Sequence, residues 1–502
     1  MNTEELHRIA VAALRQRGLL PDFSAEAQQQ AAALGHAPAE AAPAAASRGG
    51  LRDLRDLPWC SIDNDDSRDL DQLTVALPVV PNAAGGVQRI LVAIADVDVL
   101  VPPGSPIDVH ARANTTSVYT AAGVFPMLPL RLSTDLTSLN EGVDRLAIVI
   151  EIVIEIAGGA DAEPAPVGAP QVSRALVRNH AQLTYNAVAA WLDGEAPAPP
   201  KAVALAGLEA NLRAQDRAGQ ALKELRRRHG ALSLSTPEAR PVFGNDGVLT
   251  DLRTEDGNRA KELIAGIMIA ANGVTARFLD AQGFPSLRRF LREPARWQRI
   301  AEIAAGLGEA LPAEPSPLAL DAFLTRRRLA EPQKFAELSL TIVKLLGSGE
   351  YMLSRPGQPA PGHFGLAVND YTHSTAPNRR YPDLITQRLI KAALAGKPPP
   401  FDDAELTELA RHCTEQEDNA NRVERLVRKS AAALLLAPHI GQRFTAIVTG
   451  VSAKGTWVRI SNPVAEGRVV QGFEGLDVGD KPKVELVGVD AERGFIDFRR
   501  AG

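Results

Sequence analysis

The sequence predicts a multidomain α+β protein with a small helical unit at its N-terminus, a large mixed domain, and a C-terminal β-barrel of the OB-fold type. Three observations support this fold class. Helical periodicity occupies residues 3–17, strand-like runs and then long helices follow, and short alternating strands begin only after Pro438. The predicted domains are residues 1–50, 51–436 and 437–502.

Composition limits the class of protein. The chain has 502 residues and is 45% hydrophobic, so it can bury a large core divided among domains. The net charge of −5 indicates no general affinity for nucleic acid, so any such contact must come from local basic clusters. Cys60 and Cys413 provide neither a disulfide framework nor a zinc ligand set. We find no apolar run long enough for a bilayer and no basic, apolar leader, and therefore expect a cytoplasmic protein that binds no membrane.

The first 50 residues predict two or three short helices and a linker. Thr3–Arg17 has apolar residues at helical spacing, Gly18–Pro21 ends that helix, and Ser24 caps a second one. Residues 37–50 are rich in alanine and proline and are typical of a linker. A helix-turn-helix fold and a simple docking appendage are equally compatible with this pattern.

The stretch from residue 51 to 436 predicts one α+β domain. Its β-branched, apolar runs predict strands over residues 73–80, 89–96 and 146–154. Apolar residues at helical spacing predict helices over residues 202–228, 258–279 and 415–436.

After Pro438 the sequence changes character. Strands at OB-fold spacing are predicted over residues 443–451, 455–460, 467–470 and 483–489. Phe444, Trp457 and Arg459 would give such a barrel a surface that combines aromatic stacking with positive charge. In an isolated small barrel, the same aromatic residues would be interpreted as core.

The segment Cys60–Leu73 concentrates five aspartates beside the first predicted strand of the domain. They are Asp63, Asp65, Asp66, Asp69 and Asp71. Such carboxylates repel one another unless cations lie among them. Asp69 and Asp71 are two residues apart, so on an extended backbone they point to one side, and Asp63 can fold back to meet them. All-oxygen ligands favour Mg²⁺ or Mn²⁺ over zinc.

Two other interpretations of this segment were weighed. A solvated acidic turn is the ordinary outcome for an acidic run. An EF-hand calcium loop is excluded because its obligatory glycine would fall on Arg68 and its closing glutamate on Thr74.

The pattern Ile62-Asp63, then Arg68-Asp69-Leu70-Asp71 and a strand, resembles the catalytic signature of the ribonuclease II/R exoribonucleases, the RNB domain family. The segment Tyr371–Leu384 is close to the family motif YTHFTSPIRRYPDL, and Val118-Tyr119 and Phe125–Pro129 resemble its SVY and PMLP motifs. Because it follows an RNB-like domain, the C-terminal barrel resembles an S1-type RNA-binding domain.

Three features depart from the family pattern. Gln72 stands where the family has a fourth aspartate, and Ala265 and Gly266 stand where its EExMIAAN helix has paired glutamates. Glu262 lies nearly one turn earlier, which is too far for their role to be transferred to it. Relatives usually begin with cold-shock OB-folds, which fifty helical residues cannot supply.

The resemblance implies a hydrolytic 3′-to-5′ exoribonuclease that degrades single-stranded RNA to 5′-mononucleotides with Mg²⁺, or with Mn²⁺ as the alternative ion. We expect a monomer. The implied metal ligands are Asp63, Asp69, Asp71 and Gln72, and the implied catalytic residues are Asp69, Asp71 and Arg379, the last of which neutralises the pentavalent phosphorane. The implied substrate contacts are Tyr119, Glu424, Arg380, Phe444 and Trp457.

Structural alternatives accompany several of these residues. Tyr119 would otherwise be a half-buried strand tyrosine, Glu424 would pair with Arg428 at i,i+4, and one of the two arginines Arg379 and Arg380 would pair with Asp383.

Two other functions were considered. An RNA-binding protein with a degenerate RNB-like centre is indicated by Gln72, Ala265 and Gly266. A metal-dependent phosphatase or nucleotidyltransferase also uses carboxylate clusters, but the S1-like barrel argues against it.

Overall fold

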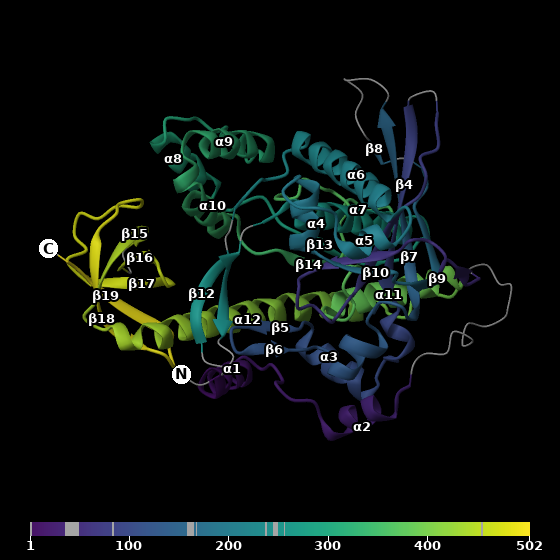
Figure 1. Cartoon of the computed structure of the whole chain (residues 1–502), viewed down its shortest axis with the longest axis horizontal. Helices are drawn as coiled ribbons and strands as arrows, with labels where there is room; N and C mark the ends of the chain where they lie inside the picture. The colour runs from purple at the N-terminus through teal and green to yellow at the C-terminus, as the bar shows by residue number, and fades with distance from the viewer. Residues whose placement is uncertain are drawn as a thin grey trace.

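The computed structural model describes residues 3–35, 50–82, 85–157, 165–166, 168–235, 238–243, 249–255, 257–452 and 455–501. Within these ranges, a helix-covered sheet forms the body, one long helix runs beneath it, and a barrel lies at the far end of that helix (Figure 1). The predicted linker falls outside the described residues except for Gly50.

A mixed eight-stranded sheet forms the centre of the body, in the order β1-β9-β7-β4-β3-β2-β10, with β8 paired to β7. The pairs from β9 through β2 are antiparallel, whereas the edge strands β1 and β10 are parallel to their neighbours. The strands are β1 (Arg52–Asp53), β2 (Cys60–Asp63), β3 (Gln72–Ala76), β4 (Gly85–Ala95), β7 (Asp144–Ala157), β8 (Ala165–Pro166), β9 (Gln171–Arg178) and β10 (Ala181–Thr184). The strands predicted over 89–96 and 146–154 are confirmed as β4 and β7, whereas the strand predicted over 73–80 ends at Ala76.

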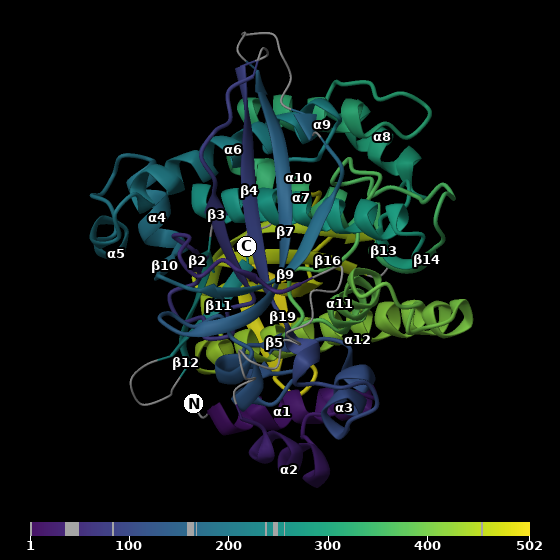
Figure 2. The ribbon, with the colours of Figure 1, turned by 90° about the vertical axis from the view of Figure 1, so that its right-hand side faces the viewer.

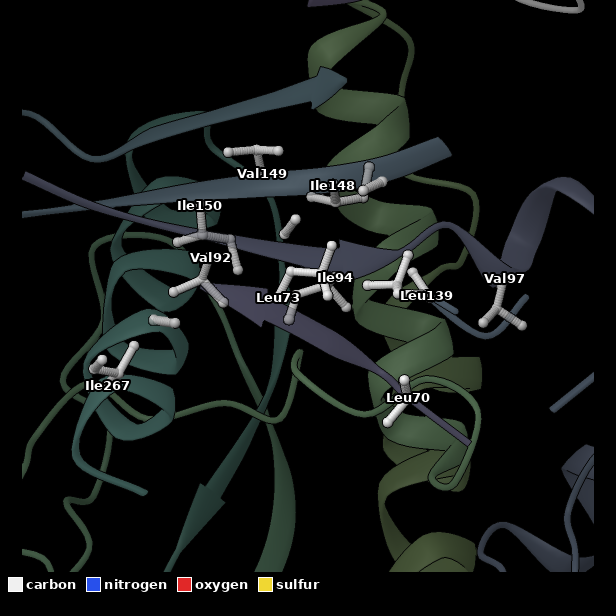
Figure 3. Close-up of a cluster of buried hydrophobic side chains, with 14 of the residues drawn as sticks. Leu70, Leu73, Val92, Ile94, Val97, Leu139, Ile148, Val149, Ile150 and Ile267 are labelled. Carbon is white, nitrogen blue, oxygen red and sulfur yellow. The ribbon is translucent and has the colours of Figure 1, made fainter. Parts of the chain in front are cut away.

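Both faces of this sheet are covered. Residues 90–95 of β4 and 147–150 of β7 are all buried, which explains why these strands have continuous apolar runs rather than alternation. Figure 3 shows Val92, Ile94 and Ile150 in this core, with Ile267 of a covering helix beside Val92.

Helices α6 and α7 lie side by side against the sheet (Figure 2). The helix predicted over 258–279 is confirmed as α7 (Arg259–Ala281), and Asn258 caps it by accepting a hydrogen bond from the Lys261 amide. The helix predicted over 202–228 is instead two helices, α5 (Pro200–Ala204) and α6 (Leu208–Arg228). The break coincides with Gly207, whose φ of 81° is left-handed and suits only glycine well.

The sequence analysis expected no apolar run long enough to span a bilayer, and helix α7 differs from that expectation. By length and composition it could cross a bilayer, but 67% of its apolar window is buried inside the structure. A buried core helix passes the same test, so α7 is weak support for a membrane span.

Two groups of elements were not predicted from the sequence. Helices α8 (Trp297–Gly306), α9 (Pro317–Ala330) and α10 (Pro332–Leu346) form a cluster with its own hydrophobic core, which lies between the body and the barrel in Figure 1. Three hairpins complete the body. They are β5 (Val118–Thr120) with β6 (Gly123–Phe125), β11 (Glu238–Phe243) with β12 (Leu249–Glu255), and β13 (Ser286–Phe290) with β14 (Glu350–Ser354).

Helix α12 (Asp403–Leu436) connects the parts of the molecule. It begins twelve residues before the predicted start at 415, after an Asp402 cap. Its successive turns enter three hydrophobic clusters, that of the sheet, that of the N-terminal helix and that of the barrel. Packing is therefore continuous across the predicted boundary at 436.

The N-terminal helices α1 (Thr3–Gln16) and α2 (Ala25–Ala33) pack on the body. Helix α1 buries its apolar face against α12 and the β5–β6 hairpin, whereas Ala27 and Ala31 of α2 belong to the main core. A helix-turn-helix would pack its helices on each other, so that interpretation does not describe residues 3–35.

The C-terminal strands close into a barrel in the order β15-β16-β17-β19-β18. The four predicted strands are confirmed as β15 (Arg443–Ser452), β16 (Gly455–Ser461), β17 (Val464–Gln471) and β18 (Lys483–Asp490). The sequence analysis missed β19 (Phe495–Arg500), which closes the barrel by pairing in parallel with β17.

Candidate functional site

Arg379 lies at the centre of the acidic cluster. Its Nε is 2.8 Å from Oδ2 of Asp71 and 3.1 Å from Oδ2 of Asp69, and its Nη2 is 3.3 Å from Oδ2 of Asp63. Nη2 also donates to the main-chain carbonyl of Asp69 at 2.8 Å. The three aspartates that the sequence predicted to converge do converge. They surround the Arg379 guanidinium instead of a metal ion.

The acidic side of the site is built by the sheet. Asp63 ends β2, and its carboxylate accepts hydrogen bonds from the Asn64 amide and the Ser67 hydroxyl, which turn the chain back toward β3. Asp71 directly precedes β3, and its carbonyl accepts from the Ala95 amide at the end of β4. Sheet pairing thus places both carboxylates at one end of neighbouring strands.

The basic side of the site is the loop that leads into α11 (Tyr381–Leu394). Asp383 accepts from the Ala376 amide at 2.9 Å and from Nη2 of Arg380 at 2.7 Å, which closes the loop over the helix N-terminus. The Arg379 carbonyl accepts from the Ser117 amide, so the loop is also tied to the segment before β5. Arg379 projects from this braced turn.

Asp71 is fully buried. Its Oδ1 accepts from the Asn378 amide at 3.0 Å, whereas its Oδ2 has no hydrogen bond despite its closeness to Arg379. Burial raises the pKa of Asp71 to about 7, although Arg379 and the Asn378 amide oppose this shift. An ionised Asp71 therefore needs more positive charge than Arg379 alone provides.

Arg379 remains charged. Burial lowers its pKa, but Asp71, Asp69 and Asp63 raise it by more, so the net shift is upward. Three carboxylates around one guanidinium leave an excess of two negative charges, which is the charge of one divalent cation.

The fit of a metal ion has one favourable and one unfavourable feature. The unbonded Oδ2 of Asp71 and the charge excess suit a hard cation with oxygen ligands. Across the described residues, however, no three His, Cys, Asp or Glu side chains are already arranged as a ligand set, because these carboxylates turn toward Arg379. The oxygen donors therefore suit a metal ion, but the carboxylates are oriented to pair with Arg379 and do not surround an ion position.

Gln72, the fourth predicted ligand, begins β3 and is partly buried. In the part of the chain that the structure describes, its side chain makes no hydrogen bond. Asp65, another aspartate of the segment, is exposed and accepts from the Asn186 amide group, away from Arg379.

Tyr119 and Glu424 lie next to each other beside the acidic cluster. The Tyr119 hydroxyl is 3.3 Å from Oδ2 of Asp69, and the Tyr119 amide donates to Oε1 of Glu424 on α12 at 2.8 Å. Tyr119 is 43% exposed, so its ring is available at the mouth of the site. Glu424 holds the hairpin that carries it.

Arg380 is the arginine that pairs with Asp383. Burial lowers its pKa, but Asp383 together with Tyr351 and Tyr371 raises it by more. Glu262 does not replace the missing glutamates, since it forms an ion pair with Lys223 at 2.7 Å in a half-exposed position.

Sequence analysis missed two residues of the site. Asn378 is buried and donates its amide to Asp71, and its side-chain oxygen accepts from the Thr137 hydroxyl. It stands where the family motif has isoleucine, which is a signal that could have identified it. Tyr185 begins α4 (Tyr185–Leu192), and burial followed by the negative charge of Asp63 raises its pKa. Only the pairing of β10 with β2 places it there.

The barrel residues Phe444, Trp457 and Arg459 are all partly buried and differ in their contacts. Trp457 lies on the outward-facing side of β16, between buried neighbours. Phe444 is partly buried, and its ring meets Phe498 of the barrel core edge to face at 6.4 Å. Arg459 forms an ion pair with Glu337 of α10 at 2.7 Å. Trp457 thus offers a stacking surface, whereas Phe444 and Arg459 also have structural contacts.

Comparison with known proteins agrees with this architecture. Residues 51–396 match the RNB domain, and residues 442–501 match the RNase II-type exonuclease C-terminal S1 domain. Ribonuclease R of Escherichia coli (strain K12) is 31% identical over 446 residues, which cover 84% of this chain and 51% of the relative. The chain spans about half the length of the curated relatives it matches.

Solved structures show the same fold. Mycoplasma genitalium RNase R in complex with ribose-methylated single-stranded RNA has a TM-score of 0.83 at 22% identity, over 98% of this chain and 77% of that one. Yeast Ssd1, a pseudonuclease, has a TM-score of 0.67 at 16% identity, over 95% of this chain and 57% of that one. Both an RNA-bound nuclease and a pseudonuclease therefore have this fold, and the fold alone does not decide activity.

Proposed function

The chain belongs to the RNB family, and from this premise we propose that it is a hydrolytic 3′-to-5′ exoribonuclease that releases 5′-mononucleotides from single-stranded RNA. The observation that carries the proposal is the convergence of Asp63, Asp69 and Asp71 on Arg379 within the RNB segment. This cluster combines the two kinds of charge that phosphodiester hydrolysis requires.

Hydrolysis of a phosphodiester needs an activated water, a positive group at the phosphoryl oxygens and neutralisation of the leaving 3′-oxygen. Arg379 provides the positive group, because its planar guanidinium matches two phosphoryl oxygens and stays charged. Asp71 and Asp69 orient the water and hold Arg379 in place. The fixed loop before α11 limits the reorganisation that this step needs.

Mg²⁺, with Mn²⁺ as the alternative ion, is the proposed cofactor. Asp63, Asp69 and Asp71 would hold it, and the side-chain amide oxygen of Gln72 would be a neutral ligand. Oδ2 of Asp71 has no hydrogen bond to give up on binding. When bound, such an ion lowers the pKa of a coordinated water and neutralises charge on the phosphoryl group.

Tyr119 is proposed to stack on the 3′-terminal nucleotide, since its ring is exposed and its hydroxyl lies against Asp69. Glu424 positions that ring by binding the Tyr119 amide and is a candidate for contact with the terminal ribose. Arg380 acts through Asp383 as a positioning residue. Trp457 on the barrel is proposed to stack on RNA farther from the 3′ end, with a smaller share for Phe444, whose ring also contacts Phe498.

We further propose that the protein acts as a cytoplasmic monomer. Cys60 and Cys413 are both free and buried, which suits a reducing compartment.

An RNA-binding protein with an inactive centre is the second candidate. Gln72 removes one ligand charge, and Ala265 and Gly266 remove two further carboxylates. This candidate also has the S1-type barrel, so it predicts RNA binding without cleavage.

One assay distinguishes the two functions. A 5′-labelled oligoribonucleotide with a defined 3′ end is incubated with the protein and Mg²⁺, and the products are resolved together with those of Asp71→Asn. Progressive shortening from the 3′ end with release of 5′-mononucleotides, absent in the variant, supports the exoribonuclease. Intact RNA that still binds the protein at every Mg²⁺ concentration supports the inactive centre.

A further inference from the structure

A cavity of about 430 Å³ lies outside the acidic site, where the C-terminal turns of α6 face the middle of α7. The strand β7 forms its floor, and residues 367–370 close one side. Figure 2 shows α6 and α7 side by side over β7. Ile152, Leu222, Ile269 and Val274 give the cavity an apolar wall of the size and character typical of small-molecule sites.

Two arginines that line this cavity form no ion pair with a carboxylate among the described residues. Arg226 makes one hydrogen bond, at 3.4 Å, to the carbonyl of Gly266. Arg277 makes no hydrogen bond or ion pair with any residue in the ranges the structure describes. Burial lowers the pKa of both guanidinium groups, and Asp370 offsets this for Arg277 only in part. A partly buried cation without an anion is costly, so each arginine is suited to a ligand of opposite charge.

A third arginine strengthens the positive field. The Arg288 side chain is 5% exposed, its Nε and Nη1 have no hydrogen bond, and its nearest carboxylate is Asp370 at 3.7 Å. The other carboxylate of the wall, Glu151, is already bound to Arg89. Arg277 and Arg288 therefore share Asp370, with Asp280 also acting on Arg288, while no described carboxylate acts on Arg226, so the charge around the cavity is net positive.

We propose that this cavity binds a nucleoside 5′-monophosphate, with the phosphate between Arg226 and Arg277 and the base against the apolar wall. A phosphomonoester carries about −1.5 to −2 charges at pH 7, which is opposite in sign to the net charge around the cavity. Its oxygens suit the paired donors of guanidinium groups. The apolar wall gives the base a surface that inorganic phosphate would leave uncovered.

One wall of the cavity continues in sequence into the loop of the proposed reaction centre. Asp370 lines the cavity and directly precedes the segment Tyr371–Arg380, which carries Arg379. The choice of a mononucleotide rests on the proposed function, since it is the product of that reaction. The cavity and its charge do not rest on it.

Calorimetric titration of the full chain with adenosine 5′-monophosphate, without divalent metal and with a chelator present, tests the proposal. We expect one site per chain, and affinity about tenfold or more weaker in both Arg226→Gln and Arg277→Gln, because each removes a charged hydrogen-bond donor. Arg227→Gln is the matched control, since Arg227 is the next residue on α6 but is exposed and paired with Glu224. Its affinity should equal that of the wild type.

Other titrations separate this proposal from the proposed function. Asp71→Asn should bind the nucleotide as the wild type does, and a loss there would place the ligand in the acidic site and overturn the inference. Inorganic phosphate that binds as tightly as the nucleotide would overturn the assignment of a nucleoside. Equal affinities in the wild type, Arg226→Gln and Arg277→Gln would overturn the cavity. Arginine-dependent binding by a chain that cleaves no RNA would keep this inference and reject the exoribonuclease.

Discussion

The acidic site and the cavity between α6 and α7 are charged in opposite senses. In the acidic site three carboxylates surround Arg379, whereas the cavity is lined by Arg226 and Arg277 with Asp370, and Arg288 lies beside Asp370. The acidic site therefore has an excess of two negative charges, and the charge around the cavity is net positive. Charge buried without compensation destabilises a fold, so its presence in two places indicates two ligands, a divalent cation and a phosphate ester.

The two regions also differ in how their arginines are held. Arg379 contacts three carboxylates and belongs to a braced loop, so its removal leaves several buried anions without a partner. Within the described ranges Arg226 hydrogen-bonds to one carbonyl and pairs with no carboxylate, so its removal leaves no buried anion there without a partner. The same substitution should therefore have opposite effects on stability.

The largest expected effect comes from replacing each arginine with methionine. Arg379→Met should lower the free energy of unfolding by about 3 kcal/mol, whereas Arg226→Met should leave it unchanged or raise it by up to about 1 kcal/mol. Urea denaturation without metal or nucleotide measures both. A similar loss in the two variants would mean that the cavity arginine has a structural partner and that the comparison is wrong.

Cleavage by Asp71→Asn should fall by about 10²–10³-fold while RNA affinity stays within about twofold, because the substitution removes a ligand charge and keeps the side-chain shape. Rates at saturating RNA and filter binding measure the two quantities. Asp65→Asn is the matched control, since Asp65 belongs to the same segment but is exposed and faces Asn186. Parallel losses of binding and turnover in Asp71→Asn would contradict the assignment.

The pH dependence of stability should also show that Asp71 contributes to the excess negative charge of the acidic site. Burial raises the pKa of Asp71 to about 7 from the unfolded value of 3.8, so the folded state holds this proton more tightly. Its contribution is most favourable below pH 4 and declines as the pH rises from 4 to 7. Asp71→Asn should therefore melt about 2–8 °C higher than the wild type at pH 8 and by a smaller margin at pH 5, in the presence of a chelator.

Calorimetric melting at both pH values makes this measurement, and addition of Mg²⁺ at pH 8 should stabilise the wild type and not the variant. The same pH dependence in Asp65→Asn would show that the effect does not come from the buried carboxylate.

The sequence predicted the residues of the acidic site but not the arginines of the cavity. The two-residue spacing of Asp69 and Asp71 and the loop motif around Arg379 are local patterns, and local patterns indicate which side chains share a face. Arg226 belongs to α6 and Arg277 to α7. They line the same cavity because both helices pack against β7, and the spacing of residues along the chain does not predict this packing.

The same limit explains the smaller differences. Phe444 was expected to face RNA because aromatic residues in OB-folds do so, but the contact with Phe498 across the barrel depends on a strand that the pattern missed. Arg459 was expected to be a free cation, but α10, which was not predicted, brings Glu337 to it. In both cases a long-range partner changed the role of a correctly placed residue.

The smallest expected effect concerns Gln72, where the family has a fourth aspartate. An amide oxygen can coordinate a hard cation but adds no negative charge, so the site should hold Mg²⁺ less tightly than four aspartates would. Gln72→Asp raises the negative excess from two charges to three. It should lower the Mg²⁺ concentration needed for half-maximal cleavage by about three- to tenfold, by comparison with the charge dependence of other oxygen-ligand sites, and leave the mononucleotide product unchanged.

Mg²⁺ titration of both proteins on one oligoribonucleotide separates three cases. A lower requirement with the same product supports Gln72 as a weak ligand of an active site. Cleavage that appears only in Gln72→Asp supports the inactive centre and makes residue 72 the position that decides activity. Identical titrations would mean that Gln72 does not face the metal, in which case the negative excess of Asp63, Asp69 and Asp71 alone sets the affinity. Nucleotide affinity of the cavity should be the same in both proteins, because Gln72 belongs to β3 and the cavity is lined by β7, α6 and α7.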